Sequence, residues 1–227
     1  MKFYIGIDDA GRGPVIGPMV LAGILVNEEQ REKIKKLGVK DSKLLFAKER
    51  EELFPKIKEI STNHFISITS STEIDNSLET GTNLNKVEAI KTAKIINELT
   101  KDISGEVEII VDCPSTNIVV WKNYVNKDIQ ENPRVKLILR CEHKADLNHP
   151  VVSAASILAK ITRDAKIEEI KKEIGIDFGS GYPSDPLTVE FLKEHALEFK
   201  DKGIFRKTWS TWKNQMKEKQ QKKLGEF

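Results

Sequence analysis

Five short apolar runs along the chain have the length and composition of β-strands. They end at turn residues or at acids, and they cover residues 2–8, 15–26, 64–69, 107–112 and 135–141. The third run alternates polar and apolar side chains, as a strand with one buried face does. The pattern therefore predicts five strands separated by longer segments.

Helical periodicity marks most of the intervening segments. It is clearest over residues 84–99, where an apolar side chain recurs at every third position from Val87 to Leu99. We predict further helices over 28–37, 47–60, 118–125, 151–172, 187–199 and 208–221. Pro55 is expected to interrupt the helix over 47–60.

This order of elements predicts an α/β fold with a mixed five-stranded sheet and helices on both faces. The first three strands can pair directly, whereas the fourth and fifth are reached through helices and would join in parallel by right-handed crossovers. We expect a first domain over residues 1–186, a helical extension over 187–220 and a tail over 221–227. One apolar stripe on the last helix predicts that the extension packs on the first domain, and it consists of Trp209, Trp212 and Met216.

The composition is that of a globular chain of 227 residues, of which 39% are hydrophobic and 32% charged. Disorder and a disulfide-built mini-protein are excluded at this length and hydrophobic content. The longest uncharged stretch near the N-terminus, residues 13–27, contains two prolines and is too short for a membrane-spanning helix. Since no secretory pattern precedes it, we expect a cytoplasmic protein, and nothing in the sequence indicates more than a monomer.

The cysteines and histidines do not form a zinc motif. Cys113 and Cys141 lie in or beside apolar runs, and the four histidines lack the spacing of zinc ligands. We predict that both cysteines are small buried side chains.

The net charge of +2 conceals an uneven distribution. From residue 200 to residue 227 the chain has nine Lys and Arg residues against three acids, a charge of +6, so the preceding 199 residues carry −4. A cationic end on a mildly acidic body indicates an anionic partner, and nucleic acid is the first candidate. A solvated basic helix is the alternative.

Four acids stand at or just beyond predicted strand ends. Asp8 and Asp9 close the first strand, Asp112 closes the fourth, and Asp146 follows the fifth. In α/β sheets the carboxyl ends of strands form the ligand site, and an oxygen-only donor set favours Mg²⁺ or Mn²⁺. Two such ions can promote phosphodiester cleavage. The alternative is that these residues cap helices and form turns.

A glycine-rich turn follows the first acids. Gly11, Arg12 and Gly13 precede Pro14, and the spacing matches neither the dinucleotide fingerprint nor the Walker motif. The turn can bring bare backbone and one guanidinium close to a ligand. By itself it is better explained as a tight hairpin turn.

Taken together, these residues resemble a known family. The segment Gly6-Ile-Asp-Asp-Ala-Gly-Arg-Gly-Pro-Val-Ile-Gly-Pro18 is similar to the opening signature of ribonuclease HII, the type 2 ribonuclease H. Further similar blocks follow in the family's order at residues 40–43, 111–112, 143–146, 151–160 and 179–186, with a looser match at 206–212. The stretch 112–117 is most similar to archaeal members.

The resemblance implies a ribonuclease H-like fold, with residues 1–186 as the catalytic domain. It also implies hydrolysis of the RNA strand of RNA/DNA hybrids, and cleavage 5′ to single ribonucleotides in duplex DNA that leaves 3′-hydroxyl and 5′-phosphate ends. Asp8, Asp112 and Asp146 take the catalytic positions that bind two Mg²⁺ or Mn²⁺ ions. At the fourth position the family normally has glutamate, whereas this chain has Asp9.

The resemblance also implies substrate contacts. Gly11, Arg12 and Gly13 match the sensor of the ribose 2′-hydroxyl, and Tyr182 matches the aromatic residue that packs on the sugar. Lys43 and Lys144 match motif positions near the substrate. We also predict phosphate contacts from one polar stripe of the long helix, formed by Ser153, Ser156, Lys160 and Arg163.

The last seven residues resemble the sliding-clamp (PCNA) binding motif. Gln221, Leu224 and Phe227 stand at the positions of its glutamine and two apolar anchors. A frayed tail is the alternative. Two other functions stay open for the whole chain. One is a DNA nuclease or resolvase of the same fold, and the other is a hybrid-binding protein whose catalysis is weakened by Asp9.

Overall fold

The computed structural model describes residues 1–39 and 45–224. The chain divides into two compact units, each built from three segments. The first unit contains Met1–Ala10, Val20–Ile68 and Leu84–Thr162, and the second contains Gly11–Met19, Thr69–Asn83 and Arg163–Phe227. The chain therefore crosses between the units five times, the last time at Arg163, and none of these crossings coincides with the expected boundary after residue 186.

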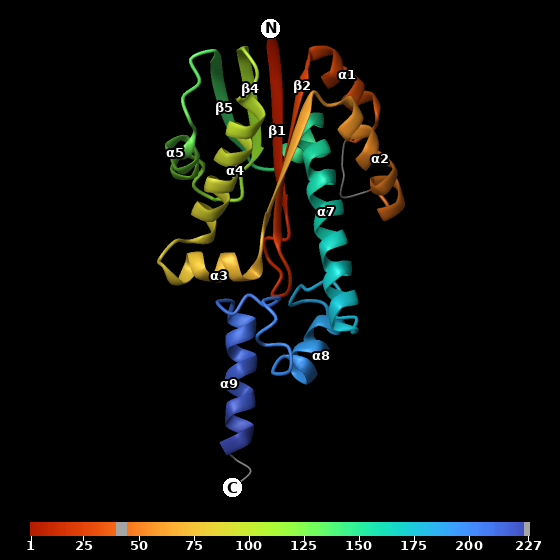
Figure 1. The fold of residues 1–227 in the computed structure, drawn as a ribbon, viewed down its shortest axis with the longest axis vertical. Coiled ribbons are helices and arrows are strands. Elements are labelled where there is room, and N and C mark those ends of the chain that lie inside the picture. Colours follow the sequence, from red (N-terminus) through yellow and green to blue (C-terminus); the bar gives the residue numbers. More distant parts are fainter. Residues whose placement is uncertain (40–44, 225–227) are drawn as a thin grey trace. The chain divides into compact units, whose positions relative to one another are not determined.

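A mixed five-stranded sheet forms the centre of the first unit, as predicted. Its strands are β1 (Lys2–Ala10), β2 (Met19–Asn27), β3 (Asn63–Thr69), β4 (Gly105–Asp112) and β5 (Val135–Glu142), in the order β3-β2-β1-β4-β5. Strand β1 runs antiparallel to β2 and parallel to β4, and β5 is parallel to β4 (Figure 1). Two parallel neighbours therefore end at the same edge of the sheet.

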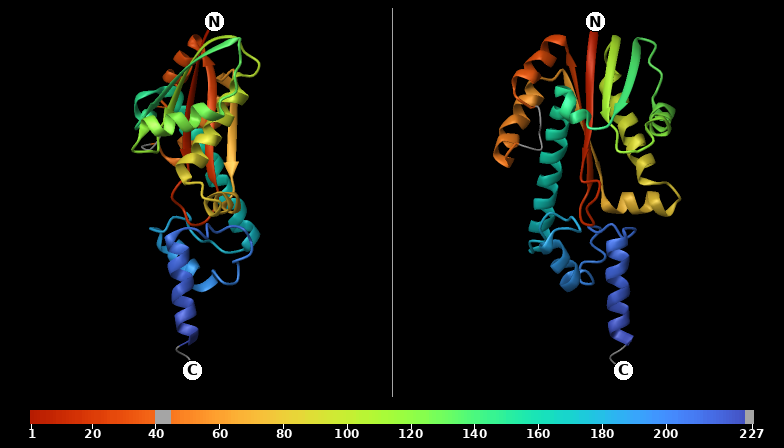
Figure 2. Two further views of the ribbon diagram at one scale, coloured as in Figure 1. Left: turned by 90° about the vertical axis from the view of Figure 1, so that its left-hand side faces the viewer. Right: turned by 180° about the vertical axis from the view of Figure 1, so that it is seen from behind.

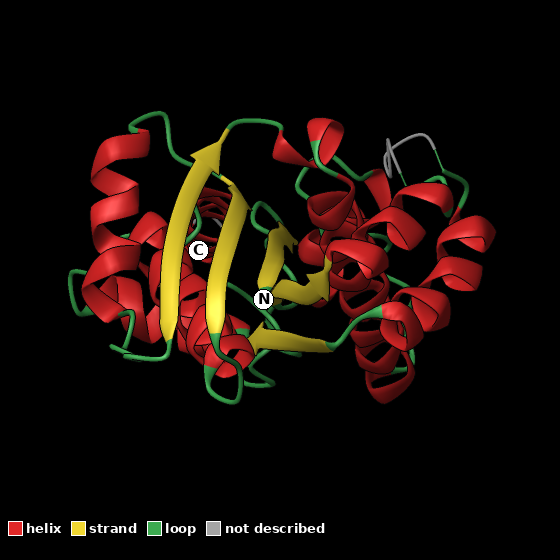
Figure 3. Cartoon of the chain, turned by 90° about the horizontal axis from the view of Figure 1, so that it is seen from above, coloured by secondary structure: helices red, strands yellow, loops and turns green. Residues whose placement is uncertain are grey.

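Helices cover both sides of this sheet (Figure 3). Helices α1 (Glu28–Lys36) and α2 (Ala47–Ile60) lie on one side, and α4 (Leu84–Thr100) and α5 (Ile118–Asp128) lie on the other, as the view from behind in Figure 2 shows. Pro55 does not interrupt α2, contrary to the prediction. Its ring lies on the exposed face, where water can replace the hydrogen bond that Pro55 cannot donate.

Helix α7 (Pro150–Ile174) approaches strand β1 closely in the first unit. A Cβ atom placed on Gly6 would lie 2.2 Å from the carbonyl carbon of Val151. Only glycine permits this contact, because no side-chain carbon fits between the two backbones. The contact fixes the start of α7 beside the strand that carries Asp8.

The second unit has its own apolar core. Val15, Ile16, Phe178, Phe205 and Trp212 are buried together, and the rings of Phe205 and Trp212 lie 4.4 Å apart. Trp209 and Met216 are partly buried against this core. Trp209 directly precedes α9 (Ser210–Leu224), and the stripe that it forms with Trp212 and Met216 packs on residues of the 11–19 segment.

Several elements differ from the sequence-based prediction. The second strand begins at Met19 because the segment before it pairs elsewhere: Ile16 forms a bridge with Phe205, and the Val15 amide donates to Gly181. Helices α3 (Ser71–Glu79) and α6 (Ala145–Asn148) were not predicted, and α8 (Pro186–His195) is shorter than expected. Within the described residues, no helix combines the length and apolarity that a membrane span requires.

Candidate active site

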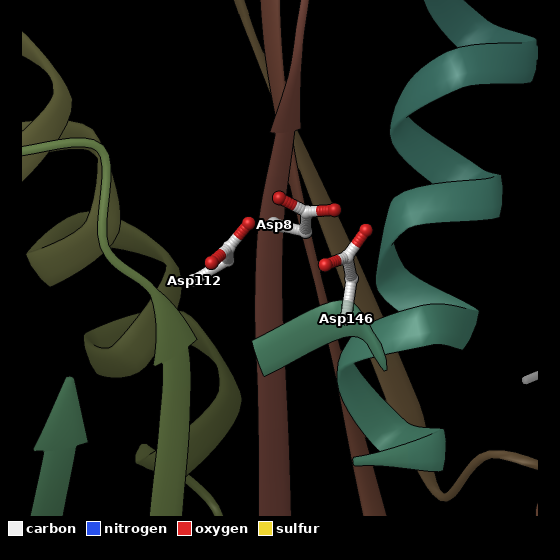
Figure 4. A group of neighbouring side chains, drawn as sticks. All are labelled: Asp8, Asp112 and Asp146. Atoms are coloured by element: carbon white, nitrogen blue, oxygen red, sulfur yellow. The ribbon is translucent and has the colours of Figure 1, made fainter. Parts of the chain in front are cut away.

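Three carboxylates converge at one edge of the sheet in the first unit. Asp8 comes from β1, Asp112 from the end of β4 and Asp146 from α6, and their side chains point toward one another in Figure 4. One oxygen atom from each carboxylate lies within 4.8 Å of the others. The parallel pairing of β1 with β4 explains this convergence, since it places Ile7 opposite Val111, the residues just before the two acids.

Hydrogen bonds from neighbouring backbone and hydroxyl groups hold the acids in place. The Ala145 amide donates to Oδ1 of Asp112 at 3.1 Å, and the Ser156 hydroxyl is hydrogen-bonded to Asp8. The Ser153 hydroxyl donates to the backbone carbonyl of Asp146. Because the first turns of α7 supply both hydroxyls, this helix positions two of the three carboxylates.

The position of Ser153 and Ser156 corrects one prediction. Both side chains are fully buried, because α7 is covered on all sides from Val151 to Ala159. A hydroxyl without solvent access cannot contact a phosphate of the nucleic acid backbone, so the predicted phosphate contacts of these two serines are wrong. Their hydroxyls support the acids instead.

The electrostatics of the cluster point to a bound cation. Burial raises the pKa of Asp8 well above its ordinary value, and the neighbouring carboxylates of Asp9 and Asp112 raise it further. The three residues offer oxygen ligands only, which suits the hard ions Mg²⁺ and Mn²⁺. Two oxygens on one Mg²⁺ lie at most about 4.2 Å apart, so the carboxylates need only small shifts to share an ion.

Asp9 does not belong to this group of three. Successive residues of a strand point to opposite faces, and Asp9 lines a small cavity of about 10 Å³ together with Glu88 and Thr92 of α4. Asp8 and Asp112 border the same cavity, so Asp9 lies next to the group of three. Sequence reasoning missed Glu88 and Thr92. Glu88 and Thr92 precede Ile95 and Leu99 at successive intervals of four, three and four residues, so they lie on the same buried face of α4. This spacing is the signal in the sequence that could have indicated their burial.

The second unit brings together the predicted ribose-contact residues. Gly11 has a left-handed backbone with φ of +80°, and Gly13 lies against the ring of Tyr182, since a Cβ atom on Gly13 would be 3.5 Å from Cε1 of that ring. The Arg163 guanidinium lies 5.1 Å from the centre of the same ring and donates to the Ser180 carbonyl. The glycine turn, Arg163 and Tyr182 therefore form one cluster.

Arg206 and Trp209 join this cluster and were not predicted as site residues. The Arg206 guanidinium donates to the carbonyl oxygens of Gly11 at 2.6 Å and Arg12 at 2.7 Å. The Trp209 indole donates to the Gly13 carbonyl at 3.2 Å. In the sequence, Arg206 is one of the charges of the basic tail and opens the looser family match at 206–212.

The remaining predicted residues are dispersed. Lys160 is half-buried on α7, Lys144 is exposed in the turn before α6, and Gln221 is exposed on α9. Leu224 is the last residue of α9. Lys43 and Phe227 lie outside the described residues.

Both cysteines are free and buried, as predicted. Burial raises the pKa of Cys141 to about 12, so this thiol stays protonated at neutral pH. Neither cysteine belongs to the one group of potential metal ligands found among the described residues, which consists of Asp8, Asp112 and Asp146.

Comparison with known proteins agrees with this geometry. The family model for ribonuclease HII matches residues 5–212. The chain belongs to the ribonuclease HII family. The ribonuclease HII of Methanococcus maripaludis strain C6 is 46% identical over 229 residues, which cover all of this chain and 92% of the relative. Membership makes the protein a hydrolase with ribonuclease H activity.

Two solved structures of ribonucleases are also similar. The crystal structure of ribonuclease H2 from Pyrococcus horikoshii has a TM-score of 0.82 and 37% identity, and the match covers 95% of this chain and 98% of that one. The ribonuclease HII in the PCNA complex from Archaeoglobus fulgidus has a TM-score of 0.78 and 35% identity over 92% of this chain and 95% of that one. The ribonuclease H-like fold expected from the sequence is thereby confirmed.

Proposed function

We propose that the protein hydrolyses the RNA strand of RNA/DNA hybrids and cuts 5′ to single ribonucleotides in duplex DNA. The products would be 3′-hydroxyl and 5′-phosphate ends. The observation that carries this proposal is the convergence of Asp8, Asp112 and Asp146 at a sheet edge in a chain of this family.

The three carboxylates would bind two Mg²⁺ or Mn²⁺ ions, with Asp9 as the fourth acid. When bound, such ions supply activation of a water molecule and stabilisation of the leaving oxygen during in-line phosphodiester cleavage. The protein's own contribution is orientation: Ser156 and the Ala145 amide hold Asp8 and Asp112 in place. Catalytic groups must be positioned within roughly 0.5 Å, so the acids depend on this support.

Selection of a ribonucleotide would fall to the second unit. The 2′-hydroxyl is the group that distinguishes RNA from DNA at a given site. The backbone of the glycine turn would bind this hydroxyl, and the ring of Tyr182, which lies beside Gly13, would pack on the sugar. Lys43, Lys144, Lys160 and Arg163 would contribute contacts to the phosphates.

A cleavage assay with matched duplexes tests this proposal. The wild type is incubated with a duplex that carries one ribonucleotide and with an all-DNA duplex, with Mg²⁺, with Mn²⁺ or with EDTA. We expect cleavage of only the first duplex, only with metal, and at its 5′ side. Asp146→Asn should lower the rate by about 10²–10³-fold, while Asp102→Asn, at an exposed position of the same unit, should not. Cleavage of both duplexes would indicate a DNA nuclease, and binding without cleavage would indicate a hybrid-binding protein.

We also propose that residues 221–227 bind a sliding clamp. The Archaeoglobus fulgidus ribonuclease HII was solved in complex with PCNA, and this chain has Gln221, Leu224 and Phe227 at the motif positions. Gln221 is exposed on α9 and accessible to a partner.

Titration of a clamp protein against full-length and truncated chains tests this second proposal. Removal of residues 221–227 and the single change Phe227→Ala should each abolish binding, whereas Glu226→Ala, outside the motif positions, should bind normally. Undiminished binding by the truncated chain would exclude the tail as the docking segment.

A further inference from the structure

Arg206 is fully buried in the second unit although it carries a permanent charge. Burial of a guanidinium is unfavourable unless hydrogen bonds satisfy its donors. Here the donors meet three backbone carbonyls, those of Gly11, Arg12 and Gly17. If this position served only for packing, an apolar side chain would make the protein more stable. The contacts of Arg206 with the three carbonyls therefore need a specific explanation.

Trp209 completes the arrangement on the same side of the turn. Its ring lies 4.9 Å from the Arg206 guanidinium, and its indole N–H donates to the Gly13 carbonyl. Three consecutive carbonyls, those of Gly11, Arg12 and Gly13, therefore accept hydrogen bonds from two side chains about 195 positions later in the sequence. We call Arg206 and Trp209 the turn clamp.

The geometry of the peptide bond gives the clamp its consequence. A trans peptide directs its N–H opposite to its C=O, and the structure contains no cis peptide bond among the described residues. The carbonyls of Gly11 and Arg12 share their peptide planes with the N–H groups of Arg12 and Gly13. Because Arg206 binds these carbonyls, the N–H groups of Arg12 and Gly13 point away from Arg206. The hydrogen bonds to the carbonyls polarise the peptide groups and make these N–H groups stronger donors.

Helix α3 anchors the segment that carries the clamp. The Asp75 carboxylate accepts hydrogen bonds from the backbone amides of Lys207 at 2.6 Å and Thr208 at 3.0 Å. The Ser71 hydroxyl contacts the carbonyls of Gly17 and Ile204. Residues 204–208 are thereby fixed to the same unit as the turn.

We propose that Arg206 and Trp209 are positioning residues that set the enzyme's preference for a ribonucleotide by fixing the glycine turn. This inference rests on the proposed function of the turn. The hydrogen bonds from Arg206 and Trp209 reach the carbonyl oxygens of the turn, so their contribution to ribose recognition runs through the backbone of Gly11, Arg12 and Gly13.

Three variants test the proposal. Trp209→Phe keeps a ring beside Arg206 and removes the donor to Gly13. Arg206→Lys keeps the charge but loses the planar set of donors that reaches several carbonyls. The matched control is Trp212→Phe, because Trp212 is buried against Phe205 in the core of the second unit.

Two readouts separate positioning from a merely structural role. The first is the ratio of affinities for a one-ribonucleotide duplex and an all-DNA duplex, measured in an Asp146→Asn background with EDTA so that neither is cut. We expect this ratio to fall about threefold in Trp209→Phe and about tenfold or more in Arg206→Lys. The second is amide hydrogen exchange, which should quicken at residues 11–13 in both variants, because these residues carry the carbonyls that Arg206 and Trp209 bind. The control should leave both readouts unchanged even if its melting temperature falls.

Each outcome decides the proposal. An unchanged affinity ratio in Trp209→Phe and Arg206→Lys, or the same change in Trp212→Phe, would overturn it. If Arg206→Lys does not fold, Trp209→Phe and its exchange pattern still decide. If the wild type shows no preference for the ribonucleotide, the proposed function is wrong, and the role of Arg206 and Trp209 in specificity is wrong with it. If the wild type shows the preference and the Arg206 and Trp209 variants keep it, only the proposal for these two residues is wrong.

Discussion

The carboxyl group of Asp8 is buried beside Asp9 and Asp112, and its pKa is raised well above the ordinary value. A raised pKa in the folded state means that ionisation of this group opposes folding. Its stabilising contribution is complete below the pKa of an unfolded Asp, about 3.9, and is lost as the pH rises through the raised pKa of the folded state. A divalent cation would offset this loss.

Asp8→Asn should therefore stabilise the metal-free protein at alkaline pH. We expect its melting temperature at pH 8, in EDTA, to exceed that of the wild type by about 3–8 °C, and the difference to vanish toward pH 4. Added Mg²⁺ should raise the melting temperature of the wild type more than that of the variant. Thermal unfolding across this pH range checks the prediction, and a difference independent of pH would contradict it.

Position 9 determines how far the fourth carboxylate reaches. Aspartate is shorter than glutamate by one carbon–carbon bond of about 1.5 Å, which exceeds the tolerance of a catalytic site. We expect Asp9→Glu to raise kcat or to tighten metal binding by about tenfold. Rate measurements over a Mg²⁺ titration test this, with Asp102→Glu as the control. Equal kcat and equal metal dependence in Asp9→Glu and wild type would refute the idea.

At the scale of elements, the contact between β1 and α7 positions the carboxylates. Strand β1 carries Asp8, and the first turns of α7 supply the hydroxyls of Ser153 and Ser156. Gly6 allows the two backbones to touch, whereas Gly38, in the same unit, has open space around it and a left-handed φ of +72°. The two glycines therefore serve different purposes.

Gly6→Ala should destabilise the protein far more than Gly38→Ala. The first change forces a carbon atom to within 2.2 Å of the Val151 backbone, so we expect a loss above about 3 kcal/mol. The second meets only the strain of a left-handed backbone, about 1–2 kcal/mol. Chemical denaturation of both variants gives the comparison, and equal losses would argue against the backbone contact.

At the scale of the whole molecule, near-neutrality is a cancellation of opposite charges. The chain carries +2 overall, but the segment after residue 199 carries +6. The acids of the first unit include the cluster that would bind cations, while Lys213 and Lys217 are exposed on α9. Phosphate contacts release counterions, so substrate affinity should fall steeply with salt in spite of the small net charge.

Substitution of two tail lysines should reduce that dependence. Lys213→Gln combined with Lys217→Gln should lower the slope of log affinity against log salt by about 2. The control combines Lys33→Gln with Lys101→Gln, which removes the same charge from side chains paired with Glu29 and Glu98. Binding titrations between low and physiological salt measure both slopes, and identical slopes would exclude α9 from the phosphate contacts.

The sequence by itself determined the five strands, most helices and the placement of acids at strand ends. These features depend on local periodicity, which a reader of the chain can see: Asp112 closes an apolar run, and the apolar stripe of α4 recurs every third residue. The same locality explains the errors. The sequence does not reveal that Pro55 lies on an exposed face of its helix. Residues 15–18 continue an apolar run, but Ile16 pairs with Phe205, far along the chain.

Only the tertiary structure decided what surrounds each functional side chain. The periodicity of α7 gave no sign that Ser153 and Ser156 would be fully buried, because burial depends on every element packed around a helix. The partners of the glycine turn were equally hidden, since Arg206 and Trp209 lie about 195 positions away and bind its backbone rather than any side chain. Backbone carbonyls are the same at every position, so a contact of this kind leaves no pattern in the sequence.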